Sequence, residues 1–140
     1  MYQKIYQTYQ QLSKGSQAEL KRCNLRKMAN VPAYFRVLKI TGLPDNTQTL
    51  RMLFLISGLN ISLDDESKTS VAMALQNAGV KESQIIQITR SGGNGIEYLK
   101  RQLIRCKNID LHSLGKLAQY WGDNVRRQLL KEYILAEQSA

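Results

Sequence analysis

The residues best suited to chemistry in this sequence are basic side chains, and the chemistry they suit is attraction of phosphate. A helix is predicted over residues 96–107, with an apolar stripe formed by Ile96, Leu99, Leu103 and Cys106. At about 100° per residue, Arg101 and Arg105 lie opposite that stripe, and Lys100 and Lys107 flank it. This helix can bury one side and offer positive charge on the other. A solvated basic face without a ligand is the alternative interpretation.

Positive charge is concentrated in two windows of the sequence. Residues 14–39 carry seven Lys/Arg against one acid, and residues 81–107 carry six against two. The net charge is +9 and the pI is about 9.7, which indicates a polyanionic partner because a basic surface attracts phosphate whatever its sequence. Two such windows can meet as one backbone-binding surface. No base-reading motif is recognised, so the predicted contacts are to phosphate.

Other residues that could carry chemistry favour a structural interpretation. His112 has no second histidine to complete a relay or metal site, and no nucleophile motif accompanies it. The acidic run over residues 64–66 lacks the ligand spacing of a calcium loop. The Gly-rich residues 91–95 follow a predicted helix and do not end in Gly-Lys-Ser/Thr, so we expect a helix break, with backbone amides at a phosphate as the alternative. The sequence therefore predicts no catalytic residue, no metal site and no cofactor.

The two cysteines and the N-terminus bear on the compartment. Cys23 and Cys106 cannot build a disulfide framework or a thiolate cluster, and both fall in helical patterns that predict inert, buried thiols. The N-terminus has no apolar signal region, and the longest apolar run, residues 52–56, is too short to span a bilayer. We expect a cytoplasmic protein with no membrane partner.

The elements that position these residues are predicted to be helices throughout. Helices are expected over residues 2–12, 17–27, 33–40, 47–59, 69–78, 82–90, 96–107, 111–121 and 123–137. Ser16, Asn94 and Asp110 are the predicted N-caps, and Pro32 suits a first turn. No strand alternation or hairpin signal is found. The fold class is therefore all-α, with about nine short to medium helices in small bundles.

The domain organisation follows from one strongly apolar helix and one polar loop. The helix over residues 47–59 is apolar nearly all round, so it is predicted to be the central core helix. The loop over residues 58–68 is the best boundary between two packed lobes. We expect an N-terminal helical lobe at residues 1–66 and a C-terminal helical bundle at residues 67–140, joined in one compact module.

Ordered motifs along nearly the whole chain resemble the CasB family, the small subunit of the Type I-E CRISPR surveillance complex Cascade. The first half supplies YQQLSKGS at residues 9–16, AELKR at 18–22, VPAYFR at 31–36, LRMLF at 50–54 and ALQNAG at 74–79. The second half supplies SQIIQITR at 83–90, LKRQL at 99–103, YWG at 120–122 and RRQLL at 126–130. Each motif is weak alone, but their order and spacing favour the resemblance.

The resemblance implies a non-catalytic subunit that binds nucleic-acid backbone in antiviral defence. It implies as partners the guide RNA, the target DNA, other Cascade subunits and a second copy of the chain. Such a subunit helps to hold the guide–target hybrid and the displaced non-target strand. A free-standing helical regulator that binds nucleic acid without sequence preference is the alternative. An enzyme that acts on nucleic acid through a clustered acidic or metal site is a further one.

The predicted backbone contacts combine the motif positions with the basic helix faces. They are Lys21, Arg22, Arg51, Lys68, Arg90, Lys100, Arg101, Arg105, Arg126 and Arg127. Arg126 and Arg127 could instead contact neighbouring subunits. The chain departs from the family pattern in its short loop before Thr69 and its reduced Gly-rich loop after Arg90, where basic residues other than Lys68 are sparse.

Overall fold

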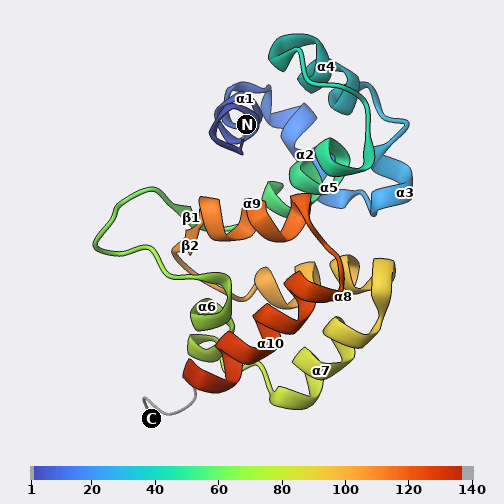
Figure 1. Ribbon diagram of the computed structural model, residues 1–140. Coiled ribbons are helices and arrows are strands. Elements are labelled where there is room, and N and C mark those ends of the chain that lie inside the picture. The colour runs from blue at the N-terminus through green and yellow to red at the C-terminus, as the bar shows by residue number, and fades with distance from the viewer. Residues whose placement is uncertain (1, 137–140) are drawn as a thin grey trace. The chain divides into compact units, whose positions relative to one another are not determined.

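A computed structural model describes residues 2–136 of the chain, and it divides into two compact units, Met1–Gly58 and Leu59–Ala140. Within the described residues there are ten α-helices, one 3₁₀ helix and two short strands (Figure 1). The all-α prediction is confirmed. A lobe boundary at residue 66 stays a prediction. No helix in residues 2–136 has both the length and the apolarity needed to cross a membrane.

The first unit consists of five short helices. They are α1 (Tyr2–Gln11), α2 (Lys14–Arg22), α3 (Leu25–Met28), α4 (Pro32–Thr41) and α5 (Thr47–Ile56). The predicted central helix is confirmed, since all five side chains from Met52 to Ile56 are buried. α5 packs against α1 and α3, and α4 packs against α1 and α2. Tyr34 is fully buried and donates a hydrogen bond to Asp45 Oδ1 at 2.7 Å.

The prediction of a single helix over residues 17–27 is wrong. Ser13, not Ser16, caps α2, because its side chain accepts a hydrogen bond from the Ser16 backbone N–H at 3.1 Å. The chain then leaves helical geometry at Cys23, and the Asn24 side chain caps the short helix α3. Asn competes well for such caps because its carbonyl satisfies an otherwise unpaired backbone donor.

The second unit contains the other helices and a small sheet. The elements are β1 (Ile61–Ser62), α6 (Val71–Asn77), α7 (Glu82–Arg90), η1 (Gly92–Asn94), α8 (Gly95–Leu103), β2 (Ile109–Asp110), α9 (Leu111–Gln119) and α10 (Asp123–Ala136). The helix α10 lies alongside α6 and α7 (Figure 1), and α7 packs against α8. Leu129 and Tyr133 bury the inner face of α10.

The strand pair corrects the expectation that no strand is present. β1 and β2 pair in parallel, with Ile61 opposite Ile109 and Ser62 opposite Asp110. Asn108, immediately before β2, has a left-handed φ of 57°, and its N–H donates to Asn60 Oδ1 at 3.0 Å. Two-residue strands show no alternation along the sequence, so this pairing comes from tertiary packing rather than from a local pattern.

Candidate nucleic-acid interface

The first unit holds most of the excess positive charge of the chain. Its 58 residues contain nine Lys/Arg and two acids, whereas the second unit contains eleven Lys/Arg and nine acids. The net charge of +9 therefore divides into +7 and +2. A strongly one-signed surface of this kind attracts polyanions.

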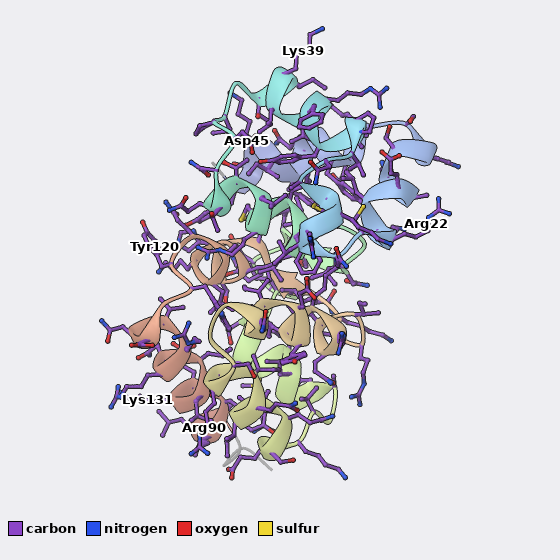
Figure 2. The ribbon with its side chains drawn as sticks, turned by 90° about the vertical axis from the view of Figure 1, so that its right-hand side faces the viewer. Arg22, Lys39, Asp45, Arg90, Tyr120 and Lys131 are labelled. Atoms are coloured by element: carbon purple, nitrogen blue, oxygen red, sulfur yellow. The ribbon has the colours of Figure 1, made fainter. Side chains whose placement is uncertain are left out.

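Two predicted contact residues lie exposed at the C-terminal end of α2. Lys21 and Arg22 form its last turn, where positive charge is favourable beside the unpaired helix carbonyls. Arg22 Nε donates to the Ala18 carbonyl at 3.1 Å. The stem of Lys21 lies against Gly58, because a Cβ added at Gly58 would come within 2.9 Å of Lys21 Cγ. The Lys21 side chain is therefore held by packing on Gly58, and the Arg22 side chain by its hydrogen bond to Ala18. Figure 2 shows Arg22 pointing outward.

The first unit has further exposed cations that the predicted site does not include. α3 carries Arg26 and Lys27, and α4 carries Arg36 and Lys39, all exposed. Lys39 points away from the unit in Figure 2. The dense basic window of residues 14–39 is the signal that could have found them, but the predicted site takes only Lys21 and Arg22 from it.

Arg51 differs from these side chains because it belongs to the core helix. It lies on α5, immediately before the buried segment that starts at Met52, and is only partly exposed. Burial lowers the pKa of its guanidinium, since desolvation disfavours the charged form. A phosphate contact by Arg51 stays a prediction.

In the second unit, the prediction that Lys100 lies on the surface is wrong. Lys100 is only 6% exposed and is one of the buried residues of α8, together with Leu99 and Leu103. α8 ends at Leu103, so Arg105 and Lys107 lie beyond the helix instead of continuing its outer face. Arg101 is the residue of this group that does lie exposed on the helix, with its guanidinium 5.3 Å from the centre of the Tyr98 ring.

Arg105 and Lys68 are engaged by neighbouring protein groups. Arg105 donates to Gln102 Oε1 at 2.9 Å and to the Ala78 carbonyl at 3.2 Å, which ties the end of α8 to the end of α6. Lys68 lies 2.9 Å from Asp65 Oδ1 and 3.8 Å from Asp110 Oδ1. The hydrogen bond with Asp65 raises the pKa of the Lys68 ammonium. Neighbouring carboxylates make Lys68 a weak attractor of phosphate.

Arg126 and Arg127 are adjacent in the sequence but have different surroundings. Arg126 pairs with Asp123, donates to the Trp121 carbonyl at 3.1 Å, and lies 5.9 Å from the Trp121 ring centre. Arg127 is exposed on α10. The geometry gives Arg126 a structural role beside Trp121, while Arg127 is accessible to a ligand.

The glycine-rich turn after Arg90 is a packed helix break. Arg90 is exposed in the last turn of α7, and the 3₁₀ helix η1 follows. Trp121 Nε1 donates to the Gly92 carbonyl at 2.8 Å. Asn94 occupies the position before α8 but makes no side-chain capping bond, so the predicted Asn94 cap is wrong.

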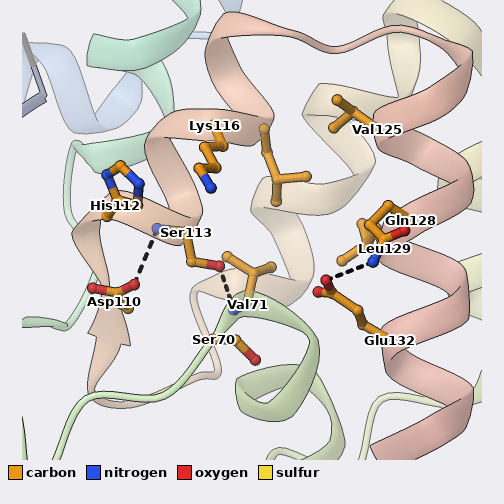
Figure 3. A pocket seen from close by; sticks show the side chains of 11 residues that line it. Ser70, Val71, Asp110, His112, Ser113, Lys116, Val125, Gln128, Leu129 and Glu132 are labelled. Atoms are coloured by element: carbon orange, nitrogen blue, oxygen red, sulfur yellow. Dashed lines mark hydrogen bonds between the residues drawn. The ribbon is translucent and has the colours of Figure 1, made fainter.

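A hollow in the second unit has mixed chemistry. It encloses about 310 Å³ between the start of α6, α9 and α10. Lys116 and His112 of α9 and Glu132 of α10 line it together with apolar side chains that include Leu129 (Figure 3). Among residues 2–136, no group of three or more His, Cys, Asp or Glu side chains is placed to hold a metal ion.

The cysteines lie in different environments. Cys106 is buried, and burial raises the pKa of its thiol to about 11. Cys23 is partly exposed. A thiol with a pKa this high is almost wholly protonated near neutral pH and therefore a poor nucleophile or metal ligand.

Comparison with known proteins shows similarity over almost the full length. The chain is 29% identical to the CRISPR system Cascade subunit CasB of Escherichia coli strain K12 over 145 positions, covering 94% of this chain and 91% of that protein. It also resembles a chain in the crystal structure of E. coli Cascade bound to a PAM-containing double-stranded DNA target. That match has a TM-score of 0.85 and 27% identity, and covers 97% of this chain and 95% of the other. No protein-family model matches the chain. The family resemblance predicted from the ordered motifs is confirmed.

Proposed function

We propose that this chain, which belongs to the CasB family, is the small non-catalytic subunit of an RNA-guided CRISPR effector complex in antiviral defence. The observation that carries the proposal is the similarity, over nearly the full chain, to a CasB subunit and to a chain of Cascade bound to target DNA. The alternative of a free-standing regulator is not favoured, because both relatives are parts of a multi-subunit assembly.

The physical task of the subunit is to hold nucleic acid by its phosphates. Replacing a DNA duplex with a guide–target hybrid is close to balanced in free energy, so protein contacts to the backbone tip the exchange. Every Lys or Arg placed on a phosphate releases counterions and favours the opened state. The subunit therefore stabilises the hybrid and the displaced non-target strand, with the guide RNA and target DNA as its ligands.

The first unit is the main phosphate-holding surface in this proposal. Its exposed cations include Lys21, Arg22, Arg26, Lys27, Arg36 and Lys39, with a low density of acids around them. In the second unit, Arg90, Arg101 and Arg127 are exposed and complete the proposed set. Lys68, Lys100, Arg105 and Arg126 are given smaller roles, because protein groups or burial already engage them.

The proposal also assigns partners and compartment. The subunit contacts the other Cascade subunits and a second copy of itself, and the complex works in the cytoplasm. No catalytic step is assigned, since the sequence has one histidine and no nucleophile motif. Divalent-dependent cleavage of DNA by the purified chain, abolished on changing Asp64, Asp65 and Glu66, would overturn the non-catalytic assignment.

The experiment that tests the function uses the assembled complex. A complex carrying Lys21→Gln with Arg22→Gln is expected to bind target DNA more weakly, because two positive charges that face phosphate are removed while the polar stems remain. The dependence of log affinity on log salt should flatten by about 0.7–0.9 for each phosphate that is no longer neutralised. Target binding measured across salt concentrations gives both quantities.

The matched control is Lys107→Gln with Lys131→Gln, which removes the same charge from exposed positions of the second unit. It should leave target affinity near the wild-type value. If both double variants assemble and bind alike, the placement of the phosphate contacts at the end of α2 is wrong. If the wild-type chain does not assemble with the guide RNA and other subunits, the proposed function itself is wrong.

A further inference from the structure

A small polar cup lies between α7 and α8 in the second unit. It encloses about 110 Å³ and is lined by Gln84, Gln87, Ile88, Tyr98, Arg101 and Gln102. These residues come from one face of each helix, at spacings of three and four residues, so the helices themselves fix the arrangement. We call this hollow the α7–α8 cup.

The lining of the cup differs from that of a phosphate site. It contains one positive charge, three side-chain amides, one aromatic ring and a buried isoleucine, with no acid. Phosphate recognition favours several cations or backbone N–H groups. Amides together with an aromatic or guanidinium plane are the groups that recognise an unstacked nucleobase.

Two of the amides are oriented by hydrogen bonds to the protein. Gln84 Oε1 accepts from the Lys81 backbone N–H at 3.0 Å, and Gln102 Oε1 accepts from Arg105 at 2.9 Å. With their oxygens engaged, the amide nitrogens of Gln84 and Gln102 are the groups left to donate. Acceptors on a base edge, carbonyl oxygens and ring nitrogens, are their natural partners.

The Arg101 guanidinium supplies a stacking plane. It lies 5.3 Å from the centre of the Tyr98 ring one turn earlier on α8, and the Arg101 side chain is exposed. Guanidinium planes and aromatic rings both stack on bases, and such stacking tolerates any base because each has a π face. The buried side chain of Ile88 adds an apolar contact at the cup wall.

We propose that the α7–α8 cup holds an unpaired nucleobase of a single strand. The inference rests on the proposed function and deepens it, because it adds a base contact to a subunit otherwise assigned phosphate contacts. The base stacks on the Arg101–Tyr98 pair, and Gln84, Gln87 and Gln102 bond to its edge. Holding one base outside a stack would oppose re-pairing of the displaced strand.

The test compares two single strands that differ only in their bases. The full chain is titrated with a fluorescent oligothymidine and with the same strand carrying abasic units in place of the nucleotides. Both have equal numbers of phosphates, so the ratio of the two dissociation constants isolates the base contribution. Wild type is expected to bind the intact strand about fivefold or more tighter.

Arg101→Lys is the decisive variant, because it keeps the charge and removes the guanidinium plane. It should retain binding to the abasic strand and lose preference for the intact one. Gln87→Ala should lower the preference as well, and Gln87 is exposed on a helix where alanine is well tolerated. Lys131→Arg is the matched control, a charge-preserving exchange at an exposed helix position outside the cup, and should keep the wild-type ratio.

The outcomes separate this inference from the proposed function. A wild-type ratio near one, with clear binding to both strands, overturns the base site and leaves phosphate binding intact. Retention of the full ratio in Arg101→Lys also overturns it. If the wild-type chain binds neither strand at any salt concentration, phosphate binding by the chain is contradicted and the base site fails with it.

Discussion

At Gly95, the backbone of α7 lies where a side chain would have to go. A Cβ built there would come 2.3 Å from the Ile88 carbonyl oxygen and 3.0 Å from Trp121 Cζ2. Gly95→Ala must therefore push α8 away from α7 or displace the Trp121 ring. Overpacking of this kind costs about 1–3 kcal/mol. We expect the free energy of unfolding, measured by urea denaturation, to fall by that amount.

Gly93→Ala is the control for this prediction. Gly93 lies in the same turn, but an added Cβ meets no atom within 4 Å. The change should alter the free energy of unfolding by well under the Gly95→Ala effect. Equal effects of the two substitutions would show that the turn responds to reduced glycine flexibility instead of to the clash with Ile88.

At the scale of one helix, the N-cap of α2 decides where the helix begins. The Ser13 side chain accepts from the Ser16 N–H at 3.1 Å, while Ser16 lies within the first turn. Ser13→Ala should destabilise the protein by about 0.5–2 kcal/mol. Ser16→Ala should be neutral or slightly stabilising, because alanine is the better helix former. Thermal unfolding of both variants checks this, and a larger destabilisation in Ser16→Ala would favour Ser16 as the cap.

The helices predicted correctly are those with strong local signals. α7 begins and ends where predicted, and Asp110 caps α9 as expected, accepting from the Ser113 N–H at 3.1 Å. The break at Cys23 is not predicted because the residues on both sides continue a helical pattern, and the Asn24 cap interrupts them. The β1–β2 pair joins residues 48 apart, which no local pattern can reveal.

The sequence predicts which segments carry the positive charge of the candidate site, but not which of those charged side chains are exposed. The window of residues 14–39 contains most of the exposed cations of the first unit. Lys100, however, is one of the buried residues of α8. The engagement of Arg105 by the Ala78 carbonyl depends on packing between α6 and α8, and the α7–α8 cup likewise needs two packed helices. A helical projection of one segment shows neither arrangement.

At the scale of the whole molecule, binding governed by net charge and binding governed by the location of the charge respond differently to the removal of cations. The first unit carries +7 of the total +9. A binder governed by net charge alone would respond equally to neutralisation anywhere, because long-range attraction depends on the summed field. A binder with a defined surface responds only where phosphates touch the protein, since counterion release is local.

Two triple variants of the isolated chain distinguish these cases. Arg26→Gln, Lys27→Gln and Arg36→Gln remove three positive charges from the first unit, and Lys107→Gln, Lys116→Gln and Lys131→Gln remove three from the second. All six side chains are exposed, so neither set should unfold the protein. We expect the first set to flatten the salt dependence of single-strand binding by about 0.7 for each phosphate that is no longer neutralised, and the second to have a smaller effect. Fluorescence anisotropy across salt concentrations measures both. Equal slopes for the two sets would mean that net charge, and not the surface of the first unit, governs the attraction.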